Sequence, residues 1–185
     1  MSAGVEVDTR AALQNAVTTA GQSVAELSMR SPVLLVFLRH FGCTFCREAL
    51  ADVRSRLPSL RGRGGRGVAV VLVHMADVAY GEQFLSGYGL ETGNGVSHVS
   101  DPEKRLYRAM GLKRGTLGQL FGWKSWVRGF KAGLIDGHLV GKLVGDGFQM
   151  PGVFLVDKGE VVRTYRHASA ADRPDYDELA VCPIR

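Results

Sequence analysis

An apolar strand pattern that runs directly into a pair of cysteines and an amphipathic helix restricts the fold more than any other feature. Residues 33–38 are apolar without alternation, which is typical of a strand buried on both faces. Between Cys46 and Leu60, apolar residues recur at spacings of four and three, which predicts a helix with one buried stripe. A second apolar run occupies residues 68–73. Strand, helix and strand within about forty residues indicate a right-handed βαβ unit.

The rest of the chain supplies further elements. Asp101-Pro102 followed by an acid predicts a helix start, and Gly111 would end that helix. Residues 153–156 and 160–165 flank a three-residue loop with a final glycine, which predicts an antiparallel hairpin with a bulge. Residues 172–179 are predicted as a last short helix. Parallel strands first and a hairpin last is the element order of a thioredoxin-like α/β sandwich, although the pattern alone leaves other α/β folds open.

Composition narrows the class of protein. The 185 residues are 45% apolar and 22% charged, as in one ordinary globular domain, so we expect a single domain over residues 1–185. The longest apolar run has six residues, and charges interrupt residues 1–13, so we expect neither a membrane helix nor a signal peptide. Three cysteines are too few for a disulfide-stapled secreted scaffold. We therefore expect a cytoplasmic protein whose cysteines are catalytic or metal-binding.

Positive charge gathers in the second half of the chain. Between Asp101 and Lys142 there are nine Lys or Arg against three acids, a local excess above the net charge of +5 of the whole chain. Aromatic residues are interleaved with these cations, a pattern that also occurs in nucleic-acid and anionic-surface binders. We favour an inserted basic helical segment, about residues 113–147, which covers the redox site, and we do not expect nucleic-acid binding.

The chemistry is expected at Cys43 and Cys46. Cys43 would lie at the amino end of the predicted helix, where free amides and the helix dipole favour a thiolate. Arg39 and His40 add positive charge or a proton-transfer group close by in the sequence. Cys46 follows one helical turn later, within reach of a disulfide with Cys43. Such a pair exchanges two electrons with a disulfide or a peroxide and needs no bound cofactor.

Other interpretations of the cysteines remain open at this stage. Cys46 begins the apolar stripe of the helix and could be a core residue. His40, Cys43 and Cys46 have spacings that could supply three metal ligands, with Cys182 as a distant fourth. A zinc site normally brings a second close pair, and since this sequence has none, we expect no metal. Cys182 could act as a third thiol, but we interpret it as an incidental residue near the terminus.

Residues 37–48, FLRHFGCTFCRE, resemble the active-site signature of the peroxiredoxin-like AhpC/TSA redox proteins, a branch of the thioredoxin fold. The resemblance covers about residues 24–180 and implies a three-layer α/β/α sandwich with a mixed sheet. It also implies thiol-dependent redox or antioxidant activity, with a disulfide or peroxide as substrate. The reductant would be a thioredoxin-like protein or a low-molecular-weight thiol, and some relatives are described as reductases of lipid endoperoxides. The matching segments are residues 37–48, 100–103, 106–108, 145–146, 153–159 and 172–175.

The chain departs from the peroxiredoxin pattern at two places. Peroxiredoxins proper carry Pro-x-x-x-Thr-x-x-Cys; if Cys46 takes the last position, Arg39 replaces the proline and Cys43 replaces the threonine. Pro151 stands where those proteins place an arginine, and it resembles the proline, typically cis, that faces Cys-x-x-Cys in thioredoxin-like proteins. Met150–Pro151 is thus a candidate cis peptide. Together with Arg39 and His40, these two residues are candidate substrate-binding residues.

Three functional hypotheses follow. In thiol–disulfide exchange, which we favour, Cys43 attacks and Cys46 resolves the mixed disulfide. In a thiol peroxidase, Cys46 becomes the sulfenic acid and Cys43 resolves it. In a non-catalytic binding module of thioredoxin fold, the basic segment would contact partners.

Overall fold

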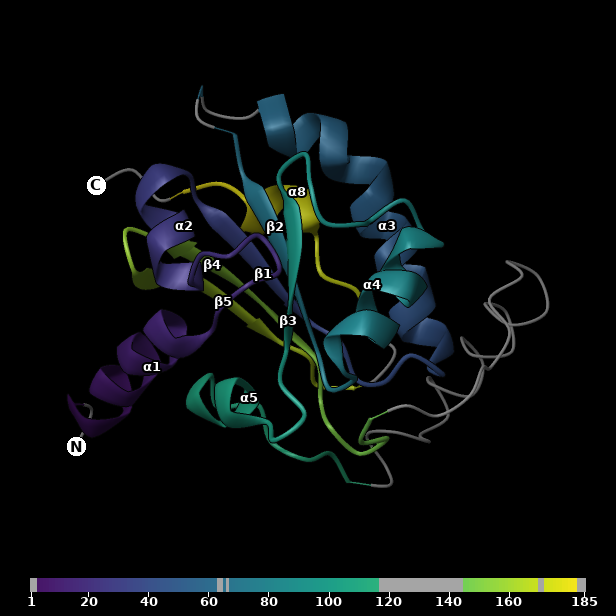
Figure 1. Cartoon of the computed structure of the whole chain (residues 1–185). Coiled ribbons are helices and arrows are strands. Elements are labelled where there is room, and N and C mark those ends of the chain that lie inside the picture. Colours follow the sequence, from purple (N-terminus) through teal and green to yellow (C-terminus); the bar gives the residue numbers. More distant parts are fainter. Residues whose placement is uncertain (1–2, 63–64, 66, 117–144, 170–171, 183–185) are drawn as a thin grey trace.

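The computed structural model describes residues 3–62, 65, 67–116, 145–169 and 172–182, and it contains a five-stranded sheet of order β3-β2-β1-β4-β5 (Figure 1). Strands β1 (Val33–Phe37), β2 (Ala69–His74) and β3 (Val96–Ser100) are parallel. Strands β4 (Gly152–Asp157) and β5 (Glu160–Arg166) form the predicted antiparallel hairpin, and β4 pairs antiparallel with β1. The mixed sheet is therefore confirmed, while most of the expected insertion, residues 117–144, lies outside the described residues.

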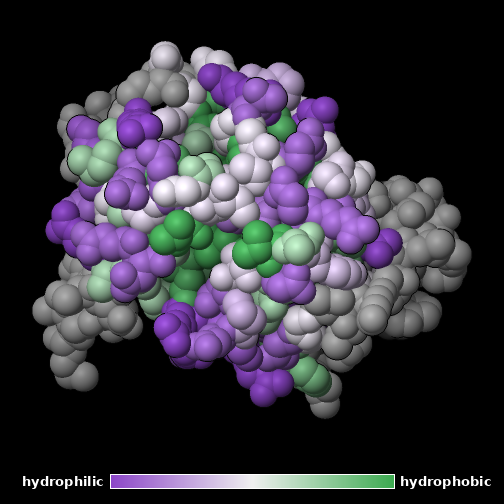
Figure 2. All heavy atoms as spheres, in the orientation of Figure 1, coloured by the Kyte–Doolittle hydropathy of each residue, from purple (hydrophilic) through white to green (hydrophobic). Residues whose placement is uncertain are grey.

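Helices cover both faces of the sheet, as a three-layer sandwich requires (Figure 1). On one face, α3 (Thr44–Gly62), α4 (Val78–Ser86) and α8 (Tyr176–Leu179) share one hydrophobic cluster with the sheet. On the other face, α1 (Ala3–Asn15), α2 (Val24–Arg30) and α5 (Arg105–Ala109) share a second cluster. The side shown in Figure 2 is mostly hydrophilic, with a small group of apolar side chains near its middle.

Strand β1 is the centre of the molecule because both faces of it are buried. Leu34 and Val36 belong to the cluster under α3, whereas Leu35 and Phe37 belong to the cluster under α1 and α5. This two-sided burial explains the unbroken apolar run. The carboxyl end of β1 pairs with Gly152 at the amino end of β4. The segment that follows β1 therefore lies beside the segment that precedes β4.

Four elements were not among the predictions: α1, α2, α4 and β3. Strand β3 has the sequence VSHVS, and polar residues at three of its five positions hide the strand pattern. Two predicted helices also begin later than expected. Helix α5 begins at Arg105, after Lys104 at the N-cap position, and the Asp101 carboxylate accepts hydrogen bonds from the backbone N–H groups of its first turn. Helix α8 begins at Tyr176, after the N-cap Asp175.

None of the helices in the described part is long and apolar enough to cross a membrane.

Candidate redox site

Cys43 lies immediately before the first turn of α3. Its backbone N–H donates to the His40 carbonyl at 3.0 Å, which closes the turn between β1 and the helix. Its carbonyl accepts from Arg47 N–H at 3.1 Å, as an N-terminal helix residue does. The sulfur is thus held beside the free N–H groups of the first helical turn, and those of Phe45 and Cys46 donate to it. The predicted placement of the first thiol at a helix start is confirmed.

Arg39 contacts both cysteine sulfurs. Its guanidinium Nη1 lies 3.5 Å from Cys43 Sγ, and its backbone N–H donates to Cys46 Sγ at 3.2 Å. The other guanidinium nitrogen, Nη2, donates to the Gly147 carbonyl at 2.5 Å. The residue is only 6% exposed, so water screens its charge weakly. Arg39, predicted as a substrate-binding residue, is therefore built into the site as a partner of the thiols.

The pKa values of the two thiols are shifted in opposite directions. The pKa of Cys43 is lowered from 9.0 to about 6, first by the hydrogen bond from the Cys46 thiol and then by the Arg39 guanidinium, although burial opposes the shift. The pKa of Cys46 is raised well above its ordinary value, because this thiol donates to Cys43 and is fully buried. At neutral pH, Cys43 is mainly a thiolate and Cys46 a thiol. This is the asymmetry that a nucleophile and a resolving thiol require.

The other predicted site residues have different surroundings. Burial, followed by the nearby charge of Arg39, lowers the pKa of His40 to about 4, so its imidazole is neutral at pH 7. Met150 is buried and packs against Phe45 of α3. The Met150–Pro151 bond is trans, so the expected cis peptide is wrong. The Pro151 carbonyl accepts from the His167 N–H at 3.4 Å, so the pairing of β4 with β5 continues to Pro151 across this trans bond.

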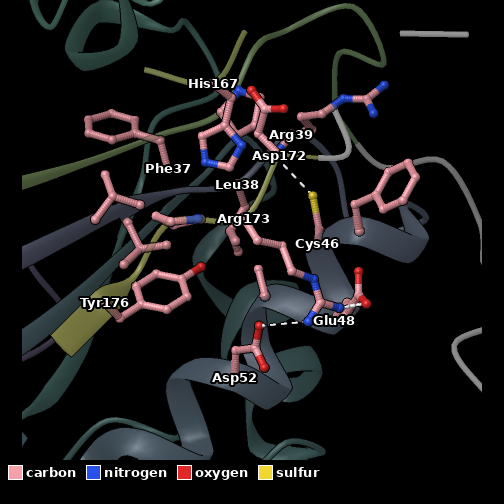
Figure 3. A pocket seen from close by; sticks show the side chains of 16 residues that line it. Phe37, Leu38, Arg39, Cys46, Glu48, Asp52, His167, Asp172, Arg173 and Tyr176 are labelled. Carbon is pink, nitrogen blue, oxygen red and sulfur yellow. Dashed lines mark hydrogen bonds and ion pairs between the residues drawn. The ribbon is translucent and has the colours of Figure 1, made fainter. Parts of the chain in front are cut away.

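A pocket opens beside Cys46, between the first half of α3 and the C-terminal segment (Figure 3). Arg39, Cys46 and Pro151 are in its wall, whereas Cys43, His40 and Met150 are not. Apolar side chains from β1 and β4 form part of it. Charged and polar side chains line the remainder, among them Glu48, Asp52, His167, Asp172 and Arg173, and Arg173 pairs with both Glu48 and Asp52.

The loop that carries Cys43 is held by aromatic contacts on its other side. The Phe41 ring stacks on Phe84 of α4, with ring centroids 4.2 Å apart, and lies 5.0 Å from the ring of His74. His74 is itself hydrogen-bonded to His98 at 2.8 Å, and His98 to the Glu82 carboxylate at 2.7 Å. Sequence reasoning missed this support, because its members come from β2, β3 and α4 and no local spacing connects them.

Cys182 lies away from the cysteine pair. The neighbouring Val181 carbonyl accepts from Arg163 Nε at 2.6 Å, and Arg163 of β5 pairs with Leu155 of β4. Leu155 in turn lies beside the amino-terminal half of β1, whereas Cys43 follows its carboxyl end. The interpretation of Cys182 as incidental stays a prediction. Within the described ranges, no group of three His, Cys, Asp or Glu side chains could hold a metal ion.

The chain is similar in sequence to known redox proteins. The family model described as AhpC/TSA antioxidant enzyme matches residues 52–170. Because that match begins after Cys46, the cysteine pair is a separate observation. The chain is 28% identical to a prostamide/prostaglandin F synthase of Danio rerio over 173 residues, covering 90% of this chain and 81% of the relative. It is 27% identical to peroxiredoxin-like 2A of Bos taurus over 156 residues, covering 84% of this chain and 65% of the relative.

Solved structures are similar in fold. Peroxiredoxin Q of Xanthomonas campestris superposes with a TM-score of 0.58 and 17% identity, over 87% of this chain and 85% of the other. A cysteine mutant of PrxQ from Xylella fastidiosa superposes with a TM-score of 0.58 and 15% identity, over 90% of this chain and 86% of the other. At these identities the similarity establishes the thioredoxin-like architecture.

Proposed function

The chain belongs to the family of AhpC/TSA antioxidant enzymes, which are thiol-dependent redox proteins, and from this premise we propose that it acts by thiol–disulfide exchange through Cys43 and Cys46. The observation that carries the proposal is the asymmetry of the pair. Arg39 Nη1 lies 3.5 Å from Cys43 Sγ, while Cys46 donates its hydrogen to the same sulfur. A stabilised thiolate with a protonated thiol beside it is the starting state of a dithiol exchange.

In the first step, the Cys43 thiolate attacks one sulfur of a substrate disulfide. A bond forms between Cys43 and that sulfur, and the second substrate sulfur leaves as a thiolate. In the second step, Cys46 loses its proton to solvent or to a departing thiolate and attacks the Cys43 sulfur. The Cys43–Cys46 disulfide forms, and the remaining substrate half leaves as a thiolate. An external thiol reductant then returns two electrons to the pair.

A peroxidase is the second candidate, and one observation favours it: Cys46, and not Cys43, lines the pocket. In this reaction the Cys46 thiolate would attack a peroxide oxygen, giving the sulfenic acid and releasing an alcohol or water. Cys43 would then attack the Cys46 sulfur, and water would leave as the disulfide forms. The raised pKa of Cys46 makes it the poorer nucleophile of the two at neutral pH, so we place exchange first.

Burial of both sulfurs favours small substrates. Cys43 is 6% exposed and Cys46 is 4% exposed, so a folded protein disulfide could approach them only after neighbouring side chains move. We propose low-molecular-weight disulfides and peroxides as the first substrates to test, with a small thiol or a thioredoxin-like protein as reductant. Because both thiols must be kept reduced between turnovers, we place the protein in a reducing compartment such as the cytoplasm.

The test measures turnover of a small disulfide and of a set of peroxides by four proteins: wild type, Cys43→Ser, Cys46→Ser and Cys182→Ser. The name of the Danio rerio relative is the reason to include a lipid endoperoxide in the set. We expect Cys43→Ser to lose disulfide turnover, Cys46→Ser to accumulate a mixed disulfide, and Cys182→Ser to retain full activity.

Two other outcomes would contradict the proposal. If Cys43→Ser still consumes peroxide in a single turnover while Cys46→Ser does not, Cys46 is the peroxidatic thiol. If neither thiol of the wild type reacts faster than an ordinary cysteine between pH 6 and 8, the non-catalytic binding module becomes the better description.

A further inference from the structure

The peptide group between Leu38 and Arg39 connects the resolving thiol to a buried tyrosine. The N–H of this peptide donates to Cys46 Sγ at 3.2 Å. The carbonyl of the same peptide accepts a hydrogen bond from the Tyr107 hydroxyl at 2.5 Å. An unbroken chain thus runs from a phenol on α5, through one amide, to the sulfur of Cys46. The thiol and the phenol come from opposite faces of the sheet.

The Tyr107 hydroxyl has a single hydrogen and two carbonyls within reach. The Val73 carbonyl lies 3.0 Å away, but it already accepts from the Leu38 N–H at 2.9 Å. The Leu38 carbonyl is closer to the hydroxyl, and it is part of the peptide whose N–H faces Cys46. The hydroxyl therefore donates mainly to the Leu38 carbonyl. It fixes the plane of the Leu38–Arg39 peptide at the point where β1 ends.

Several contacts hold the phenol in this position. Tyr107 is fully buried, and its ring packs edge-on against Phe37 with centroids 4.9 Å apart. Its backbone N–H donates to the Asp101 carboxylate at 3.2 Å, which ties α5 to the end of β3. Burial raises the pKa of Tyr107 well above its ordinary value, so the hydroxyl keeps its hydrogen as a donor throughout the working pH range.

We propose that Tyr107 is a positioning residue for Cys46: through the Leu38–Arg39 peptide, its hydroxyl aims and polarises the N–H that stabilises the Cys46 thiolate during the resolving step. Hydrogen bonds in a chain polarise one another, so a donor on the carbonyl strengthens the N–H on the other side of the amide. The negative charge on Cys46 exists only while this thiol attacks the mixed disulfide. The effect should therefore appear in the second step and not in the attack by Cys43. The inference rests on the proposed exchange function.

The test follows one turnover with one equivalent of 4,4′-dithiodipyridine, in a Cys182→Ser background to remove the third thiol. Attack by Cys43 releases one thiopyridone, in a phase whose rate depends on reagent concentration. Resolution by Cys46 releases the second thiopyridone, in a phase whose rate does not. Tyr107→Phe removes only the hydroxyl. We expect the second phase to slow by about twofold to fivefold, because one hydrogen bond in a chain strengthens its neighbour by up to about 30%, while the first phase is unchanged.

Val156→Ala is the matched control, because Val156 belongs to the same buried cluster as Tyr107 but pairs with Val33 at the opposite end of β1. It lowers stability without touching the peptide, so both phases should keep their wild-type rates. A fluorotyrosine at position 107 keeps the hydroxyl and makes it a stronger donor, and it should accelerate the second phase. This variant decides the matter if Tyr107→Phe does not fold.

The outcomes separate the inference from the function on which it rests. An unchanged second phase in Tyr107→Phe, or an equal slowing of both phases, would refute the positioning role while leaving exchange intact. A wild type that releases no second thiopyridone, or that releases the first from Cys46, would refute the proposed exchange itself. A second phase slowed equally in Val156→Ala would show that general destabilisation is the cause, which also refutes the positioning role.

Discussion

Replacing Arg39 by methionine removes the charge beside Cys43 and keeps a long unbranched side chain in the same buried space. At the observed 3.5 Å between Nη1 and Sγ, an effective dielectric constant of about 20 gives an upper limit of about 5 kcal/mol for the attraction. A hydrogen bond to a charged group contributes about 1.5–3 kcal/mol net, which corresponds to about 1–2 pKa units. We therefore expect the pKa of Cys43 to rise from about 6 to between about 7 and 8.

The assay is the rate of alkylation of Cys43 by iodoacetamide between pH 5 and 10, with the modified residue located by mass spectrometry. At pH 7 the thiolate fraction should fall from about nine-tenths to between about one half and one tenth, and the rate should fall with it. Arg47→Met is the control, because Arg47 donates to the Phe41 carbonyl and lies over the Phe84 ring rather than on a sulfur. A Cys43 pKa that is the same in Arg39→Met and wild type would refute the electrostatic account of this site.

Two further predictions concern stability. Because the pKa of Cys43 in the folded protein is about 6, below its ordinary 9.0, the reduced protein should gain stability as pH rises from about 6 to 9 and lose it as pH falls through 6. The gain in the free energy of unfolding, measured by urea unfolding, is at most about 4 kcal/mol, and Cys43→Ser should show a flatter dependence of this free energy on pH. Equal pH dependence in the two proteins would contradict the lowered pKa. In Gly81→Ala, the new Cβ would lie 2.4 Å from the His74 ring, so unfolding should become easier by about 1–3 kcal/mol, whereas Gly62→Ala, with open space around it, should be neutral or slightly stabilising. A Gly81→Ala protein as stable as Gly62→Ala would show that His74 moves aside freely.

The central part of the fold could be predicted because its signals are local. The apolar run before Arg39 and the stripe that begins at Cys46 each lie within one element, and the structure has β1 and α3 there. Strand β3 could not be recognised in the same way. Its residues Ser97 and His98 are buried, and His98 is hydrogen-bonded to Glu82 of α4 and to Thr19 between α1 and α2, contacts that the order of residues does not reveal.

The candidate site likewise has a part that the sequence predicts and a part that it does not. The two cysteines and Arg39 lie within eight residues of one another, so their spacing alone predicts that they meet. The Gly147 carbonyl, which accepts from Arg39, is a backbone group, and any residue could supply it. Tyr107 reaches the site from the opposite face of the sheet, so no periodicity in its own helix indicates the contact. The expected cis proline was wrong: the Met150–Pro151 bond is trans, and the Pro151 carbonyl already accepts from His167 beyond the end of β5.

Glu82, His98 and His74 form a row of hydrogen-bonded side chains. The outermost member, Glu82, determines which ring nitrogen of His98 donates. Hydrogen bonds from Thr92 lower the pKa of the Glu82 carboxyl, so it is ionised and can only accept. The Nε2 atom of His98 must therefore carry a hydrogen, which it donates to this carboxylate. One carboxylate at the outer end thus orients His98, whose other ring nitrogen lies 2.8 Å from the buried His74 ring beside Phe41. A glutamine at position 82 could donate as well as accept, so Nε2 of His98 would no longer be restricted to donating.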